Sequence, residues 1–259
     1  MGDGNIDRLG SIAKELVESR PDVIFAGSTP SVTAIARETR TIPIVFANVS
    51  DPVGSGLVES LARPGGNLTG FTNYEYTVGG KWVEILKELD PSLRRIAIVF
   101  NPGTAPSQGS QYLRSIETAA RSLAIEPIST PIHEIAELES VLRPFARQSN
   151  GGLIVMSDAF AVIHRKILIS LAARYRLPAI YPFPIMAEDG GLAAYGSDSV
   201  DLYRRAAAYI DRILRGARPG DLPIQQPTKF ALIRNLKTAK ALGLESPPTL
   251  LARADEVIE

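Results

Sequence analysis

The sequence predicts an α/β protein whose parallel sheets are covered by helices on both faces. Short, continuously apolar segments such as "DVIFAG" (22–27) and "RIAIVFN" (95–101) alternate with segments whose apolar residues recur at helical spacing. The alternation restarts after a long helix at 78–89, and 259 residues are enough for two cores. No low-complexity linker interrupts the chain, so we expect two doubly wound lobes joined by hinge crossings.

The elements follow in order. Apolar residues from Ile6 to Val17 are spaced as in a helix that ends before Pro21. The strand at 22–27 leads into a helix, with Thr29 as the expected N-cap and Pro30 at its first position. Further strands are expected at 42–47, 68–71, 95–101, 125–129, 152–158, 178–182 and 191–196. Further helices are expected at 78–89, 108–122, 134–147, 161–175 and 200–216.

The composition narrows the classes of function. Twenty-eight basic and 28 acidic residues give a formal net charge of zero, which does not favour nucleic acid or an anionic membrane as a partner. The chain has no cysteine, which excludes disulfides and thiolate chemistry. No apolar run approaches the ~18 residues needed to span a bilayer. The start "MGDGNIDRLG" lacks the pattern of an export signal, so the chain as written would be cytoplasmic.

Motifs for catalysis or cofactor binding are weak. In the glycine-rich stretch at 51–70, Glu59 stands where a dinucleotide fingerprint needs its third glycine. "VGGKW" (78–82) has Trp82 where a phosphate loop needs Ser or Thr, and no G-x-S-x-G elbow is present. His133 before a helix and His164 on an exposed helix side have no partner at metal-ligand spacing. We therefore expect no cofactor, no metal and no enzyme.

Polar and aromatic residues at the carboxyl ends of the strands predict a ligand-binding protein instead, because open α/β sheets bind ligands there. The helix start at Gly27-Ser28-Thr29-Pro30-Ser31 suits a carboxylate, although Thr29 could simply cap its helix. "NPGTAPSQ" (101–108), "SDAFA" (157–161) and "YPFP" (181–184) lie at equivalent strand ends, where Asp158 could pair with an ammonium group. The loops also contain aromatic residues that could stack on a planar ligand or serve ordinary packing: Tyr74, Tyr76, Phe160, Tyr181 and Phe183.

Long blocks of the sequence carry a family resemblance. They include "PIVFANVSDPVGSGLVESLARPGGNLTGFT", "LAARYRLPAIYPF", "GGLAAYG", "DLYRRAAAYIDRILRGARPGDLPIQQPTKFALIRNLKTAKALGL" and "PPTLLARADEVIE". From about Asp7 to Glu259 the chain resembles ABC-transporter substrate-binding proteins of the type that binds tryptophan or tyrosine. The resemblance implies the type I periplasmic-binding-protein fold, in which two lobes joined by three crossings close on a small ligand for delivery to a membrane permease.

The resemblance also implies where the ligand contacts lie. They are the loops at 28–31, 50–51 and 72–76 of one lobe and at 101–104, 157–160 and 181–183 of the other. The candidate residues are Ser28, Thr29, Ser31, Ser50, Asp51, Thr72, Tyr74, Asn101, Thr104, Asp158, Phe160 and Tyr181. The expected ligand is an aromatic amino acid, and a branched-chain acid, another carboxylate or a heterocycle would fit the same loops. The glycines of 51–70 then belong to a turn near the cleft.

One departure concerns the first lobe. Family members begin with an export or lipoprotein signal and a strand, a helix and a second strand, which this sequence lacks. We expect lobe one, at 1–93 with about 197–217, to be incomplete, and lobe two to comprise 94–196 with about 218–259. The ligand site would be weakened, or a dimer formed by strand exchange would cover the gap. By resemblance, the full-length protein is periplasmic or lipid-anchored outside the cytoplasm.

Two other classes stay open at this point. An effector-binding domain of a transcriptional regulator or signalling receptor has the same general fold, but no helix-turn-helix or basic arm is present. An isomerase on a two-lobed scaffold would need a nucleophile and base pair that the sequence does not supply.

Overall fold

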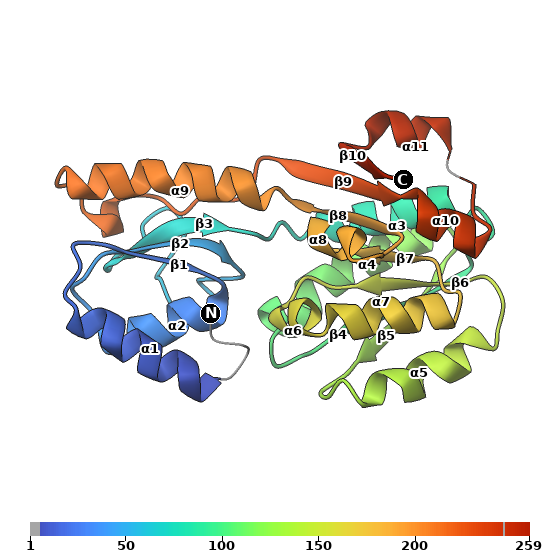
Figure 1. Ribbon diagram of the computed structural model, residues 1–259, viewed down its shortest axis with the longest axis horizontal. Coiled ribbons are helices and arrows are strands. Elements are labelled where there is room, and N and C mark those ends of the chain that lie inside the picture. Colours follow the sequence, from blue (N-terminus) through green and yellow to red (C-terminus); the bar gives the residue numbers. More distant parts are fainter. Residues whose placement is uncertain (1–5, 246) are drawn as a thin grey trace. The chain divides into compact units, whose positions relative to one another are not determined.

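The structure is a computed structural model that describes residues 6–245 and 247–259 (Figure 1). The chain forms two compact units. The first contains the residues up to Glu75 together with Asp198–Lys229, and the second contains Tyr76–Ser197 and Phe230–Glu259. The chain therefore passes between the units three times, at 75–76, 197–198 and 229–230. Within the described ranges no helix has the length and apolarity to cross a membrane.

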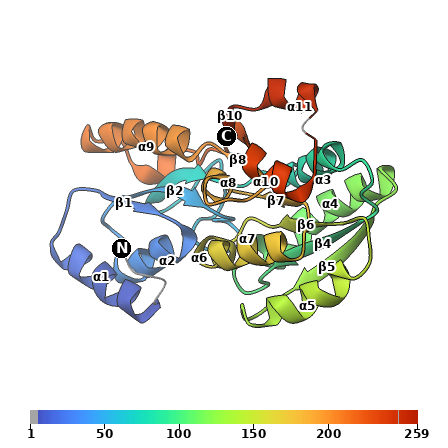
Figure 2. The same cartoon turned by 45° about the vertical axis from the view of Figure 1, so that its right-hand side comes forward.

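The first unit is a parallel sheet with helices on both faces. Its elements are α1 (Ile6–Glu18), β1 (Ile24–Gly27), α2 (Thr29–Glu38), β2 (Ile44–Val49), β3 (Leu68–Thr72), α9 (Ser199–Leu214) and the short η2 (Pro219–Asp221). The strand order is β1-β2-β3. Figure 2 shows α1 and α2 on one side of this sheet and α9 on the other.

Alternation along β2 explains the two helical layers. Ile44 and Phe46 belong to the core cluster shared with α1 and α2, while Val45 and Ala47 belong to the cluster shared with α9. All four side chains are fully buried. Successive side chains of a strand point to opposite faces, so a continuously apolar strand must be covered on both.

The second unit contains the remaining elements. Its first half comprises α3 (Val78–Leu89), β4 (Arg95–Phe100), η1 (Pro106–Gly109), α4 (Ser110–Ser122), β5 (Glu126–Pro131), α5 (Glu137–Ala146) and β6 (Gly151–Val155). Its second half comprises α6 (Ala159–Ile163), α7 (Arg165–Arg174), β7 (Ala179–Tyr181), α8 (Pro184–Glu188), β8 (Ala193–Ser197), β9 (Phe230–Asn235), α10 (Leu236–Leu242), α11 (Pro248–Arg253) and β10 (Glu256–Ile258).

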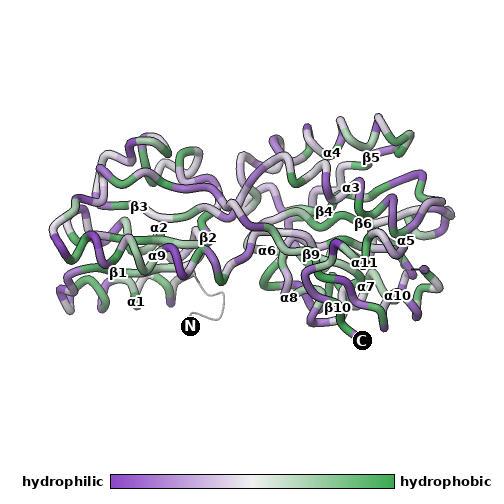
Figure 3. The backbone as a smooth tube through the Cα atoms, turned by 90° about the horizontal axis from the view of Figure 1, so that it is seen from above, coloured by the Kyte–Doolittle hydropathy of each residue, from purple (hydrophilic) through white to green (hydrophobic). Residues whose placement is uncertain are grey.

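The sheet of the second unit has the order β10-β9-β8-β7-β6-β4-β5, and only the β8–β9 pair among these strands is antiparallel. Figure 3 shows the hydrophobic strands β4 and β6 between the layer of α3 and α4 and the layer of α7. Trp82 of α3 is buried, stacks on Tyr112 of α4 at 5.3 Å, and donates its Nε1–H to the carbonyl of Tyr195 at 2.7 Å. These contacts fix α3 to the second unit.

The predicted α/β class, with two lobes of mostly parallel sheet, is confirmed. The expected lobe boundaries differ from the observed units in two places. The helix at 78–89 packs on α4 and so belongs to the second unit, whereas residues 218–229 belong to the first. In the latter segment Gln225 pairs with Phe71 and accepts a hydrogen bond from the Thr72 amide at 2.9 Å.

Three local predictions were also wrong. The helix expected at 161–175 is two helices, α6 and α7, that meet at His164. The helix expected at 108–122 begins only at Ser110, after η1. Thr29 is not an N-cap, because α2 begins at Thr29 and Ser28 occupies the cap position. The strands β9 and β10 near the C-terminus were not expected.

Candidate functional site

The strands of the first unit bring several predicted residues to one edge of its sheet. Gly27 pairs with Ala47 and Val49 pairs with Thr72, so these strands end close together. The residues that follow the three ends are Ser28, Thr29 and Ser31 after β1, Ser50 and Asp51 after β2, and Asn73 and Tyr74 after β3. The carboxyl edge of a parallel sheet is where ligands of such folds bind.

Five of these residues form two hydrogen-bonded sets that meet where Ser28 precedes Thr29, and we call them together the hydroxyl cluster: Ser28, Thr29, Ser31, Ser50 and Asn73. The Thr29 hydroxyl accepts a hydrogen bond from the Ser50 amide at 3.0 Å and donates to the Ser50 carbonyl at 3.3 Å. The Ser50 hydroxyl donates to Asn73 Oδ1 at 2.8 Å. Ser28 and Ser31 hydroxyls lie 3.1 Å apart. The cluster thus ties the starts of three loops together at the N-terminus of α2.

The backbone is strained at the same edge. Ser28, Asn48 and Asp51 have φ angles of 76°, 56° and 47°, which are uncommon for residues other than glycine. Such conformations cost of order 1–3 kcal/mol each and concentrate at binding and active sites. Six of the nine non-glycine residues with positive φ in the described chain lie elsewhere, so these angles agree with a functional edge but do not identify it by themselves.

Asp51 and Thr72 occupy buried positions beside the hydroxyl cluster. Asp51 Oδ1 accepts the Gly54 amide at 2.8 Å, and a Cβ on Gly54 would lie 2.2 Å from Asp51 Oδ2. The carboxylate therefore organises the glycine-rich turn, and a negative group there does not suit phosphate. Thr72 is fully buried, and its Oγ1 has no hydrogen-bond partner among the described residues. Tyr74 is 6% exposed, so its ring is largely packed.

In the second unit, Asn101 and Asp158 lie together at the ends of β4 and β6. The backbone N–H of Asn101 donates to Asp158 Oδ2 at 3.0 Å, and the side-chain Nδ2 of Asn101 donates to the His133 carbonyl at 2.9 Å. Asn101 Oδ1 accepts the Gly103 amide at 2.8 Å, and the Asn101 carbonyl accepts the amide of the exposed Thr104 at 3.1 Å. Asn101 therefore shapes the loop at 101–104.

Asp158 is the N-cap of α6, with Oδ1 accepting the Ala161 amide at 2.5 Å. Burial raises the pKa of its carboxyl from 3.8 to about 6, although backbone hydrogen bonds from Asn101, Ala161 and Phe160 oppose the shift. The side chain is 2% exposed. Helix capping by itself explains why a carboxylate is buried at this position, and pairing with an ammonium group stays a prediction.

Phe160 and Tyr181 belong to the apolar core of the second unit. Tyr181 is 1% exposed, and burial raises the pKa of its hydroxyl. Ordinary packing thus explains both rings. His164 is partly buried rather than exposed, with its ring 4.5 Å from that of Phe160, and burial lowers the pKa of its imidazole.

The sequence reasoning missed Asn73 and Ser157 as individual candidates. Asn73 lies inside the expected loop at 72–76, but its partner Ser50 is 23 residues away and no local pattern marks the contact. Ser157 precedes Asp158 and is 3% exposed, and its Oγ has no partner among the described residues. No group of metal ligands is found in the described part of the chain.

The chain forms two α/β units that are linked by three chain passages, and polar loops follow the strands of each unit. These features are typical of a two-lobed binding protein. The family model for ABC transporter substrate binding proteins matches residues 2–258, and the chain belongs to that family.

Known proteins and structures agree with this assignment. A tyrosine-binding protein from Clostridioides difficile is 30% identical over 235 residues, which is 91% of this chain and 67% of the relative. A conserved domain protein from Vibrio cholerae is 30% identical, has a TM-score of 0.86, and is matched over 98% of this chain and 84% of its own. A Streptococcus ABC domain solved with L-tryptophan shares the fold at 24% identity and a TM-score of 0.87, over 98% and 85% of the two chains.

Proposed function

We propose that this protein is the solute-binding component of an ABC importer and that it captures an amino acid, most favourably an aromatic one. Family membership and the hydroxyl cluster at the N-terminus of α2 are the observations that carry the proposal. The protein would act outside the cytoplasmic membrane, where a permease collects the ligand. Its role is binding rather than catalysis.

The hydroxyl cluster suits the carboxylate of an amino acid. The start of a helix presents backbone N–H groups and partial positive charge, which favour an anion. The Ser28 side chain makes no capping bond to the first turn of α2 and instead meets Ser31. Two hydroxyls and the helix start thus lie together, as a carboxylate with two acceptor oxygens requires.

The aromatic preference rests on the tyrosine-binding relative, which is 30% identical to this chain. Contact of the ligand with the loops at 101–104 and 157–160 of the second unit stays a prediction. One variant in each unit tests ligand contact there: Ser31→Ala in the first unit and Thr104→Ala in the second.

The first experiment is a thermal-shift screen of L-tyrosine, L-tryptophan, L-phenylalanine, branched-chain amino acids and simple carboxylates. A ligand at ~100 times its Kd stabilises the folded protein by about 2.7 kcal/mol. We expect the aromatic amino acids to give the largest shifts. A screen in which none of these compounds shifts the transition would overturn the proposal.

Calorimetry with L-tyrosine then locates the carboxylate site. Ser31→Ala should raise Kd by about tenfold or more, because a hydrogen bond to a charged group contributes ~1.5–3 kcal/mol. The matched control is Ser19→Ala, which removes an exposed serine hydroxyl of the same unit that bonds the Leu16 carbonyl. Equal affinity in both variants would place the carboxylate elsewhere.

The importer role needs its own test. Uptake of labelled L-tyrosine into vesicles that contain the cognate permease should require the protein and fall about fivefold with Ser31→Ala at ligand concentrations near the wild-type Kd, because a tenfold higher Kd lowers the occupancy by that factor. Uptake that does not depend on the added protein would contradict the transport part of the proposal.

A further inference from the structure

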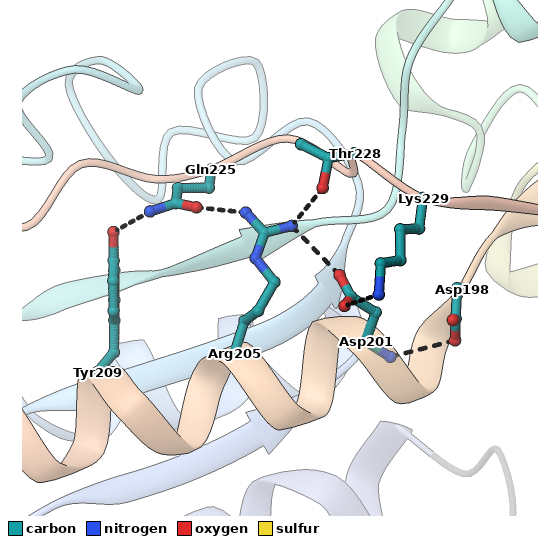
Figure 4. A network of polar contacts seen from close by, with 7 residues as sticks. All are labelled: Asp198, Asp201, Arg205, Tyr209, Gln225, Thr228 and Lys229. Carbon is teal, nitrogen blue, oxygen red and sulfur yellow. Dashed lines mark hydrogen bonds and ion pairs between the residues drawn. The ribbon is translucent and has the colours of Figure 1, made fainter.

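A network of seven polar side chains lies in the first unit where the chain enters and leaves it (Figure 4). We call it the passage network. Asp198 is the first residue of the unit after Ser197, and Lys229 is the last before Phe230. The members are Asp198, Asp201, Arg205, Tyr209, Gln225, Thr228 and Lys229. Each of the seven side chains takes part in a hydrogen bond or ion pair of the network.

The network begins where two passages of the chain run side by side. Ser197 pairs with Phe230 at the end of the antiparallel β8–β9 ladder. In the next pair, the Asp198 amide donates to the Lys229 carbonyl at 3.0 Å. Two of the three passages therefore form a two-stranded ribbon. The side chains of Asp198 and Lys229 fix the end of the ribbon that belongs to the first unit.

Asp201 is the centre of the network. Its side chain is 9% exposed, and its oxygens lie 3.2 Å from Lys229 Nζ and 3.5 Å from Arg205 Nη1. Its amide donates to Asp198 Oδ1 at 3.1 Å, which caps α9. Lys229 and Arg205 offset the cost of removing this carboxylate from water, and Asp201 is the partner that the two cations share.

Arg205 carries the network to the strand end of the candidate site. It donates to Thr228 Oγ1 at 3.2 Å and to Gln225 Oε1, and its guanidinium lies 4.9 Å from the centre of the Phe71 ring. The Gln225 backbone accepts the amide of Thr72 at 2.9 Å. Thr72 directly precedes Asn73 of the hydroxyl cluster. One set of contacts therefore holds both the ribbon and the end of β3.

We propose that Asp201 is a positioning residue for ligand binding, which fixes the ribbon and the end of β3 without contacting the ligand. This inference rests on the proposed function. When an uncharged residue replaces Asp201, Lys229 and Arg205 lose their shared partner and the ribbon fluctuates more. Ligand binding must then order these segments, and this ordering weakens the affinity.

The test compares Asp201→Asn with Asp189→Asn. Asp189 pairs with Arg165 at 2.7 Å in the second unit, and both side chains are 27% exposed, so this variant also breaks an ion pair, but one outside the passage network. L-tyrosine affinity is measured by calorimetry. Amide hydrogen exchange is measured by mass spectrometry in peptides that contain 197–199 and 228–230, with and without saturating L-tyrosine.

For Asp201→Asn we expect a Kd about three- to tenfold above wild type, the range that mutations coupled to a remote site produce. Exchange in the two peptides should be faster than in wild type without ligand and should return to the wild-type rate at saturation. Asp189→Asn should match wild type in both measurements. A purely structural role would lower the melting temperature of Asp201→Asn but leave Kd unchanged.

A wild-type Kd and wild-type exchange in Asp201→Asn would overturn the inference and leave the proposed function standing. If none of the compounds in the thermal-shift screen binds the wild type, the ligand-dependent part is overturned together with the proposed function, while the exchange data still decide whether Asp201 holds the ribbon. If Asp201→Asn does not fold, Lys229→Gln replaces it. The Lys229 side chain is 62% exposed, so its substitution leaves no cavity.

Discussion

Replacing Asp158 with asparagine should remove a pH dependence of stability that the structure places in the second unit. Burial raises the pKa of this carboxyl from 3.8 to about 6. Because the folded-state pKa lies above the unfolded value, the stabilising contribution is fully present below pH 3.8 and is lost as the pH rises through 6. Between pH 7.5 and pH 5 the wild type should therefore gain about 1.4 kcal/mol relative to the variant.

The assay is urea unfolding at pH 5 and pH 7.5, followed by the fluorescence of Trp82. Trp82 is the single tryptophan of the chain and lies in the second unit, so it reports the unit that contains Asp158. Asp158→Ser is a second neutral variant that can still cap α6, and it should lose the same pH dependence whatever its absolute stability. A difference between wild type and Asp158→Asn that is the same at both pH values would refute the reasoning.

Two further predictions concern the cores. Gly70→Ala should lower the stability of the first unit by about 3 kcal/mol or more, because the new Cβ would lie 2.1 Å from the Phe46 carbonyl oxygen and the φ of Gly70 is 152°. Thermal unfolding measures this loss, and a melting temperature like that of wild type would contradict the prediction. Trp82→Phe should lower the free energy of unfolding by about 1–2 kcal/mol, because the hydrogen bond from the indole N–H to the Tyr195 carbonyl is lost. Calorimetric unfolding measures this change, and an unchanged transition would show that the hydrogen bond contributes nothing.

The sequence predicted the elements whose pattern is local. The helix at 78–89 has the predicted bounds, because its buried residues recur at helical spacing and Pro91 follows closely. The strand expected at 95–101 ends only one residue earlier than predicted. In these segments periodicity and the next breaker residue determine the structure together.

Elements that depend on distant partners could not be predicted in this way. The segment "FALIRN" contains Arg234, which reads as a solvent residue, yet its side chain is fully buried and donates to the Leu192 carbonyl at 2.9 Å. The break at His164 lies in a run without glycine or proline, so no local residue marks it.

In the candidate site, too, features set by local pattern were predicted and features set by distant contacts were not. The positions of the loops came from the strand pattern and the family resemblance, while the roles of side chains depend on tertiary contacts. Thr29 was expected to cap its helix, but its hydroxyl bonds Ser50, 21 residues away. Asp158 was expected to be able to pair with an ammonium group. Its carboxylate caps α6, a role that no local pattern had indicated, and the pairing stays a prediction.

The segment around Gln225 has a consequence for self-association. Its amide donates to the Gly70 carbonyl and its carbonyl accepts from the Thr72 amide, so a stretch outside the named strands occupies the outer side of β3. Unsatisfied peptide groups along a sheet margin recruit other polypeptides, and this margin is already occupied by the chain itself. Any intermolecular strand pairing by the first unit, including the strand-exchanged dimer that stays a prediction, would therefore have to proceed along β1.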